Sequence, residues 1–334
     1  MPSSLAVDTH ILSLKAHGED LETYVKRYRL PANPNAGGRK ALSRNDSVTI
    51  LLLHGLGCVK EQWEPTIERL FELEKAGPGL RQRPTICEVW SIECPDHGQS
   101  ALLNETVLRG RVEPVMCRTY ALTVLALFRS GLLAQSLKPR FVLVGQCGGA
   151  VTAVLSTMMF REPSGVPFTS IILINPWFYS AQLIKVNADA RREASQYAEY
   201  SKTIPDIWRS REEALRYLKA EKYHRSWHPQ VLEQFVKSGV TSLPSRAYPL
   251  ETEGVTLVYP RTIERRAMQL LYEVQPMLQH LRHLGHRVPV HVAFGEIQST
   301  ATQEFQRAVS NEVESLASIR YLPRTGLRAI QQSP

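Results

Sequence analysis

The sequence predicts an α/β protein whose mostly parallel central sheet is covered by helices on both faces. Apolar runs of strand length alternate along the chain with stretches of helical spacing. The run Val48–Leu53 is apolar at nearly every position, as expected of a central parallel strand. In Phe141–Ala150 a third apolar run ends in Gly-x-Cys-x-Gly and passes directly into a helix-compatible stretch.

Hydrophobic spacing and turn residues place the expected elements in order. Two β-like segments, 9–16 and 21–30, open the chain, and a surface loop rich in Pro and Gly follows at 31–38. Strands are expected over 48–53, 85–92, 140–144, 169–174, 288–294 and 318–322. Helices are expected over 61–73, 121–133 and 150–160.

The pattern changes between 176 and 287 to helices rich in aromatic residues. We therefore expect 1–175 and 288–334 to form the core, and 176–287 to form a helical lid over the carboxyl ends of the strands. Ser210–Glu213 is a capping box that opens a helix. The aromatic residues either pack the insertion onto the sheet or contact a substrate, and they are Trp177, Phe178, Tyr179, Tyr197, Tyr200, Trp208, Tyr217, Tyr223, Trp227 and Phe235.

Composition excludes several classes of protein. With 43% hydrophobic and 22% charged residues over 334 positions, the chain is globular. No apolar run approaches the roughly 20 residues of a membrane span, so no membrane partner is expected. The net charge of +8 comes from scattered residues, and Glu264 interrupts the densest cluster, Arg261–Arg266. This indicates a solvated basic surface and no nucleic-acid partner.

The five cysteines lack the spacing of a disulfide framework, which indicates a reducing compartment, with the cytoplasm as the default. No C-x-x-C or Cys/His pairing with metal-ligand spacing occurs, so we expect no metal and no cofactor. His280, His283 and His286 lie three residues apart and are interpreted as packing or solvent-facing side chains. Four cysteines are expected to be small buried hydrophobes, namely Cys58, Cys87, Cys94 and Cys117.

The segment Gly145–Gly149 has the context of a nucleophile elbow, a strained turn between strand and helix that lifts one side chain above the sheet. Side chains at Gly145 or Gly149 would collide with the neighbouring strand or helix. Cys147 is therefore the candidate nucleophile, and its thiol stands where most such elbows carry a serine.

A second loop, Leu53–Gly57, directly follows the strand 48–53. Backbone N–H groups of Leu56 and Gly57, together with that of Gly148, are the candidates for an oxyanion hole. His54 is expected to be structural. Asp96, with its neighbour His97, is expected to fix the turn after the strand 85–92.

At these residues the chain resembles the α/β-hydrolase superfamily, with its His-Gly loop, its Asp-x-Gly-x-Ser turn and its elbow in order. It resembles more narrowly the fungal hydrolases of toxin biosynthesis that serve polyketide and hybrid peptide clusters, including those of AK-toxin and cytochalasan type. The narrower resemblance rests on the opening phrases Leu52–Gly57 and Lys60–Pro65 and on the lid phrases Trp208–Ala214 and Trp227–Leu232. It implies an α/β-hydrolase fold and a small polyketide-type substrate.

The chain departs from the superfamily pattern at two places. The superfamily carries its acid after the strand that is here 288–294, where Glu296 is the only nearby carboxylate. Its histidine follows a glycine after the last strand, where this chain has Leu327 after Gly326 and no histidine beyond His291. One hypothesis is that the sequence after Arg324 reflects a truncation or a misassigned exon boundary.

A cysteine depends less on a base than a serine does, because its free pKa is about 8.5 and a helix N-terminus lowers it. Three functions therefore stay open. The chain is a hydrolase or thioesterase acting on a polyketide-derived acyl intermediate, or a cyclase that promotes an intramolecular condensation such as one of Knoevenagel type. The third alternative is a non-catalytic binding protein on the same scaffold. The sequence leaves the oligomeric state open.

Overall fold

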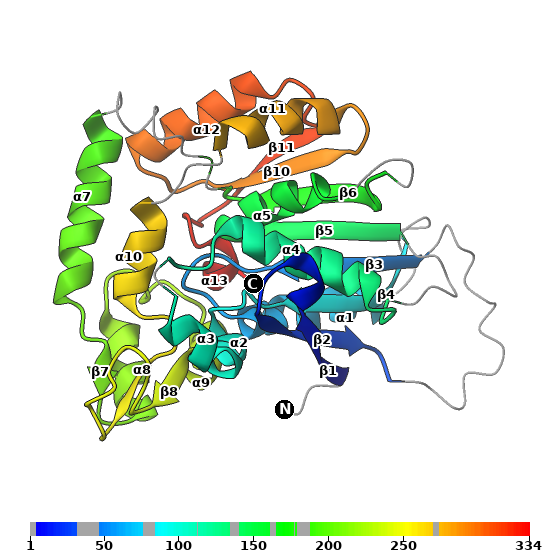
Figure 1. Ribbon diagram of the computed structural model, residues 1–334. Coiled ribbons are helices and arrows are strands. Elements are labelled where there is room, and N and C mark those ends of the chain that lie inside the picture. The colour runs from blue at the N-terminus through cyan, green and yellow to red at the C-terminus, as the bar shows by residue number, and fades with distance from the viewer. Residues whose placement is uncertain are drawn as a thin grey trace.

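An eight-stranded sheet forms the centre of the computed structural model, in the order β1-β2-β4-β3-β5-β6-β10-β11 (Figure 1). β1 and β2 form an antiparallel hairpin, and β2 pairs antiparallel with β4. From β4 to β11 the six strands of the sheet are parallel to one another. The expected fold class is confirmed. The strands are β1 (Ala6–Ser13), β2 (Glu22–Arg29), β3 (Ser47–Leu53), β4 (Thr85–Ile92), β5 (Arg140–Gln146), β6 (Phe168–Ile174), β10 (Val290–Gly295) and β11 (Ser318–Leu322).

The structure describes residues 5–31, 47–75, 84–111, 113–133, 140–160, 165–176, 178, 188–269 and 274–334. The loop expected over 31–38 lies outside these ranges except for Pro31. Trp177 and Tyr179 also lie outside them.

Helices cover both faces of the sheet because successive strand residues point to opposite sides. Leu51 and Leu53 of β3 join the apolar cluster under α4, α5 and α11, whereas Leu52 joins the cluster under α1 and α13. The central strand β3 is therefore apolar on both faces from Ile50 to Leu53, as a doubly covered sheet requires. These helices are α1 (Glu64–Lys75), α4 (Cys117–Arg129), α5 (Gly148–Thr157), α11 (Val274–Gly285) and α13 (Ala329–Gln332).

The helix expected over 121–133 is displaced toward the N-terminus. The structure has α4 over Cys117–Arg129, so the helix begins and ends four residues earlier than expected. The end is set by Gly131, whose φ of 77° is left-handed, a conformation in which helices commonly stop. Among the described residues, the core also contains the helices α2 (Gly98–Leu103), α3 (Glu105–Arg109) and α12 (Thr300–Glu312).

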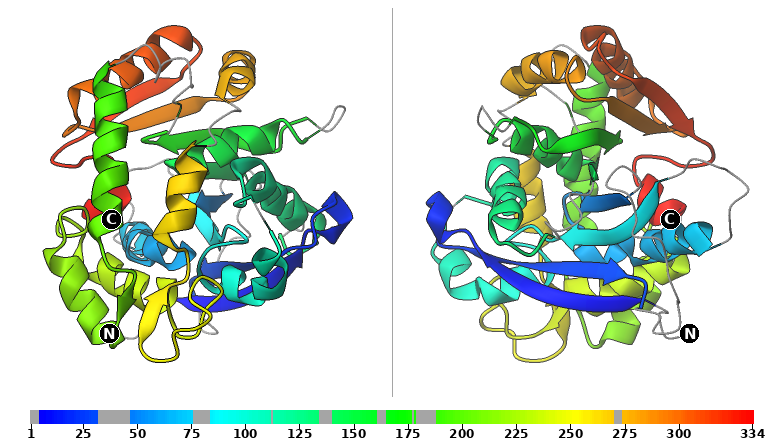
Figure 2. Two further views of the ribbon diagram at one scale, coloured as in Figure 1. Left: turned by 60° about the vertical axis from the view of Figure 1, so that its left-hand side comes forward. Right: turned by 90° about the vertical axis from the view of Figure 1, so that its right-hand side faces the viewer.

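The insertion between β6 and β10 lies beyond one end of the sheet, and it contains strands as well as helices (Figures 1 and 2). A small antiparallel sheet, β7-β9-β8, was not expected from the sequence, because its strands have only two or three residues. The inserted elements are α7 (Ala188–Thr203), β7 (Ile207–Trp208), α8 (Arg211–Ala220), α9 (Pro229–Gly239), β8 (Val240–Ser242), β9 (Val255–Leu257) and α10 (Arg261–Gln269).

The insertion has an apolar core of its own. Trp208, Trp227 and Phe235 are buried together with residues of α8 and α9. Ser210 caps α8 as expected, its hydroxyl accepting a hydrogen bond from the Glu213 N–H. Between these described residues the return bond of the expected capping box is absent, because the Glu213 carboxylate accepts the N–H of Arg209 and not that of Ser210. By contrast α11, although inside the range 176–287, buries Met277, Leu278, Leu281 and Leu284 in the main core.

A buried ionic cluster connects the hairpin β1–β2 to the start of α1. The ammonium of Lys60 is fully buried and lies 3.0 Å from the Glu93 carboxylate and 2.8 Å from that of Glu61. Lys26 of β2 pairs with Glu61 and Glu64 at 3.0 and 3.2 Å. Two cations and three carboxylates are thus gathered at this junction.

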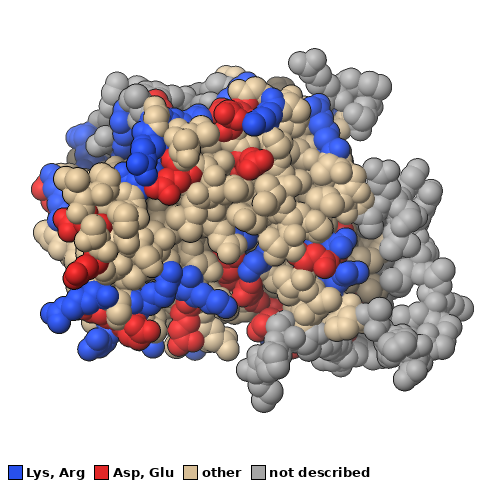
Figure 3. Space-filling view, turned by 60° about the horizontal axis from the view of Figure 1, so that its bottom comes forward, with Lys and Arg blue, Asp and Glu red and all other residues tan. Residues whose placement is uncertain are grey.

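On the face shown in Figure 3, Lys and Arg side chains are interspersed with Asp and Glu side chains. Among the described residues, no helix has the length and apolar character needed to cross a membrane.

Candidate active site

The elbow places Cys147 between the last residue of β5 and the first residue of α5. Its backbone angles are φ 54° and ψ −117°, a strained conformation for a residue other than glycine. The flanking glycines make the close packing possible. A Cβ at Gly145 would overlap the carbonyl of Gly149, and one at Gly149 would overlap the carbonyl of Leu53.

The Cys147 thiol is 7% exposed and lies at the N-terminus of α5. Burial raises the pKa of Cys147, while Arg328 and the backbone N–H groups of Gly148 and Leu56 act to lower it. The net shift of this pKa is upward. Desolvation of the thiolate therefore outweighs the groups that lower this pKa, including those at the N-terminus of α5.

Two backbone N–H groups converge on the thiol and form the candidate oxyanion hole. Those of Leu56 and Gly148 both act on Cys147, and a Cβ added to Gly148 would lie 3.6 Å from the Leu56 nitrogen. The N–H of Gly57 instead donates to Nε2 of His97 at 3.1 Å. We therefore propose an oxyanion hole formed by the N–H groups of Leu56 and Gly148, because the N–H of the third expected residue, Gly57, is already engaged.

His54 is held on both ring nitrogens and is neutral. Its Nδ1 contacts the Gly55 carbonyl at 2.9 Å, and its Nε2 accepts the N–H of Cys94 at 3.0 Å. Burial lowers the pKa of His54 to about 3. The Tyr120 hydroxyl fixes the same loop, since it accepts the His54 N–H at 3.1 Å and donates to the Ile92 carbonyl at 2.8 Å.

Asp96 shapes the turn after β4. Its carboxylate contacts Nδ1 of His97 at 2.6 Å and accepts the N–H of Val115 at 3.1 Å and the thiol of Cys94 at 3.2 Å. The donor atoms of Cys94, Asp96 and His97 lie within 4.8 Å of one another, a spacing compatible with a metal ion. Their hydrogen bonds satisfy one another, however, and the His97 ring also stacks on Tyr259 at 3.8 Å.

The structure does not bring Glu296 together with Cys147. Glu296 is exposed, and its Oε2 accepts the N–H of Arg324 at 3.1 Å. The residues that reach the cavity from this side are Leu327, where the superfamily places its histidine, and Arg328. His280 and His291 likewise make structural contacts, to the hydroxyls of Thr157 and Ser318 at 2.8 Å each.

Asn175 holds the segment that delivers Leu327 and Arg328. Its side-chain amide donates to the carbonyls of Gly326 and Leu327 at 3.0 and 3.2 Å, and its oxygen accepts the N–H of Gly295 at 2.8 Å. No local sequence pattern marks Asn175, because its side-chain partners lie more than a hundred residues away along the chain.

Cys147 opens on a cavity of about 80 Å³ between the core and α10. Glu264, Ala267 and Met268 of α10 form one wall. The described aromatic residues of the insertion do not line this cavity, which favours their packing role. The other walls are formed by core residues, namely His54, Gly55, Leu56, Cys94, His97, Val115, Met116, Cys117, Tyr120, Cys147, Gly148, Val151, Leu327 and Arg328.

The fold and the elbow are those of an α/β hydrolase, and the comparison with known families agrees. The alpha/beta hydrolase family model matches residues 50–297, which is more than half of the chain. The chain therefore belongs to the alpha/beta hydrolase family.

Relatives of known activity include two proteins of Penicillium brevicompactum. The type I acyl-CoA thioesterase mpaH is 25% identical over 205 residues, covering 61% of this chain and 42% of that protein. The type I acyl-CoA thioesterase mpaH′ is 24% identical over 220 residues, covering 66% and 46% respectively. This chain thus spans less than half the length of these two relatives.

Solved structures with the same fold are more distant in sequence. The peroxisomal alpha-beta-hydrolase Lpx1 of Saccharomyces cerevisiae has a TM-score of 0.70 at 16% identity, covering 99% of this chain and 85% of that one. The thioesterase domain of the curacin biosynthetic pathway has a TM-score of 0.63 at 13% identity, covering 98% and 96%. At such identities the similarity establishes the fold.

Proposed function

We propose that this chain is a cysteine-dependent acyl-transfer enzyme of fungal secondary metabolism, acting on a small polyketide-type acyl thioester. The observation that carries the proposal is the placement of Cys147 at a strained elbow, with the N–H groups of Leu56 and Gly148 directed at its thiol. The similarity to acyl-CoA thioesterases supports a thioester as the substrate class.

In the proposed step the Cys147 thiolate attacks the thioester carbonyl. A bond forms between its sulfur and the carbonyl carbon as the bond from that carbon to the carrier sulfur breaks. The carrier leaves as a thiolate and takes up a proton from water. The N–H groups of Leu56 and Gly148 would stabilise the negative charge on the carbonyl oxygen during the transfer.

Release of the acyl group by water is expected to be slow. A general base typically contributes 10²–10⁴-fold to such a step. The histidines that line the cavity among the described residues, His54 and His97, both have their Nε2 atoms occupied by backbone N–H groups. We therefore favour capture of the acyl group by a nucleophile within the same bound intermediate, as in a cyclisation or condensation, where orientation in the cavity replaces the base.

A non-catalytic binding protein remains the second candidate. It is favoured by the burial of Cys147 and by the upward shift of its pKa, which reduce the thiolate fraction at neutral pH.

Intact-mass spectrometry after incubation with a short acyl thioester of N-acetylcysteamine tests the proposal. We expect one acyl group on Cys147, persisting long after acylation is complete. Cys147→Ala should give no adduct, and Cys147→Ser should give almost none, because a hydroxyl without a base is a poor nucleophile. Rapid turnover without an accumulated adduct would support an ordinary thioesterase, and the absence of both adduct and turnover would support the binding protein.

A further inference from the structure

Two oppositely charged side chains face each other in the otherwise largely apolar cavity. Arg328 follows Leu327 at the end of the core, and Glu264 comes from α10 of the insertion. Nη2 of Arg328 lies 3.8 Å from Oε1 of Glu264, and their side chains are 26% and 9% exposed. The Tyr197 hydroxyl of α7 also donates to this Glu264 oxygen at 3.1 Å.

The guanidinium of Arg328 is held by hydrogen bonds to the loop Leu53–Gly57 and to the cysteine that follows it. Nη1 donates to the Leu56 carbonyl at 3.2 Å and to the Cys58 sulfur at 3.1 Å. The main chain behind it is anchored by α13, where the amides of Gln331 and Gln146 exchange hydrogen bonds of 2.8 and 3.0 Å. Arg328 is therefore held beside the elbow by both its side chain and its backbone.

We propose that Arg328 serves as the fixed cation of this active site, with Glu264 as its counter-ion, and that it stabilises the Cys147 thiolate from the position next to Leu327, the residue that stands where the family carries its histidine. The inference rests on the proposed function in assigning Cys147 as the nucleophile. Because a guanidinium stays protonated, it stabilises a thiolate but does not accept a proton from water. An arginine at this place favours acylation over hydrolysis.

The electrostatics of the cavity point the same way. Burial has the largest effect on the pKa of Cys147 and raises it. The charge of Arg328 has the second largest effect and is the strongest that lowers this pKa, whereas Glu264 acts to raise it. Burial acts to lower the pKa of Arg328 itself, but the negative charges of Cys58 and Cys147 in their thiolate forms and of the Glu264 carboxylate hold it above its ordinary value.

The remaining titratable groups that line the cavity are His54, Cys94, His97, Cys117 and Tyr120. Burial lowers the pKa of His54 to about 3 and raises the pKa values of Cys94 and Tyr120 well above their ordinary values. These three groups are neutral near pH 7, so Arg328 and Glu264 supply the principal opposing charges. Cys58, behind Arg328, is also neutral there, because burial raises its pKa to about 11.

The test is the pH dependence of iodoacetamide labelling at Cys147, read by peptide mass. Arg328→Met should raise the pH midpoint of labelling by about one unit, which corresponds to roughly tenfold slower labelling at a fixed pH below the midpoint. Arg328→Lys should recover part of the shift. Glu264→Gln should move the midpoint downward, because it frees Arg328 from its carboxylate partner.

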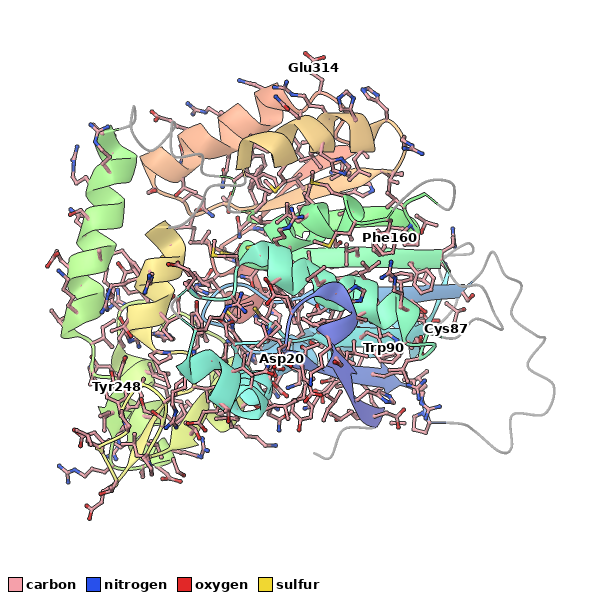
Figure 4. The ribbon with its side chains drawn as sticks, in the orientation of Figure 1. Asp20, Cys87, Trp90, Phe160, Tyr248 and Glu314 are labelled. Atoms are coloured by element: carbon pink, nitrogen blue, oxygen red, sulfur yellow. The ribbon has the colours of Figure 1, made fainter. Side chains whose placement is uncertain are left out.

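Two controls separate charge from folding. Arg320→Met removes an exposed cation of β11 and should leave the midpoint unchanged. Cys87 near the start of β4 lies at the opposite end of the molecule from Tyr248 of the insertion (Figure 4), so its labelling in the same samples should not respond to Arg328. Thermal melting of each variant reports whether the fold is intact.

An unchanged midpoint in a folded Arg328→Met variant would overturn the inference. Should that variant unfold, an unchanged or raised midpoint in Glu264→Gln would overturn it equally. Failure of the proposed function would give a different experimental result from failure of this inference. In that case the wild-type protein gives no adduct with a thioester, while the labelling midpoints still shift with Arg328 and Glu264.

Discussion

At the scale of single residues, the site depends on backbone approaches that only glycine permits. Gly145 and Gly149 allow the backbones of β5, α5 and the end of β3 to approach one another closely. Gly55 allows the loop after β3 to pass close to Cys147. A Cβ at Gly55 would lie 3.1 Å from the Cβ of Cys147. The strained angles of Cys147 are thus held in place by its surroundings.

Gly149→Ala should destabilise the protein by about 1–3 kcal/mol, because the new methyl group would overlap the carbonyls of Leu53 and His54. Urea denaturation would measure the loss. Gly110→Ala is the matched control, since its Cβ would meet no atom closer than the Val107 carbonyl at 3.8 Å. Equal stability of the two variants would show that the elbow is less tightly packed than described.

The residues that sequence could predict are those whose signal is local. The two glycines around Cys147 and the strand before them define the elbow within ten positions of the chain. The partner of the Gly57 N–H could not be predicted, because His97 lies 40 residues away. Arg328 is 272 residues from the Leu56 carbonyl that it holds, and no local pattern marks it.

At the scale of elements, the sequence predicted the strands well and the insertion poorly. Long apolar runs identify β3 to β6 because burial on both faces favours apolar residues at most positions. The small sheet β7-β9-β8 has no such signal, and its strands are defined only by pairing across the insertion. The expected helix extends past the end of α4 because the apolar pattern continues to Leu133, whereas Gly131 with its left-handed φ stops the helix.

The junction of β2, β4 and α1 depends on the fully buried ammonium of Lys60. Lys60→Met should lower the free energy of unfolding by about 3–5 kcal/mol, because it leaves the carboxylates of Glu61 and Glu93 without this cation. Denaturation of the single variant and of Lys60→Met/Glu93→Gln would test this. The double variant should recover part of the loss, and a larger loss in the double variant would contradict the role of the pair.

At the scale of the whole molecule, the site lies where the core and the insertion meet. The core supplies Cys147 and the oxyanion hole, and α10 supplies one wall of the cavity. We keep as a proposal the division into a core of 1–175 and 288–334 and a lid of 176–287. Within that range α10 faces the cavity, whereas α11 packs on the sheet.

The central claim is that this chain takes up an acyl group on Cys147 and passes it to water only slowly. The release of p-nitrophenol from p-nitrophenyl acetate, followed in time against enzyme concentration, tests it most directly. We expect a burst of about one equivalent followed by a much slower steady rate, because acylation needs no base whereas hydrolysis of the acyl-enzyme does. Sustained, efficient turnover without a burst would contradict the account and restore an ordinary hydrolase.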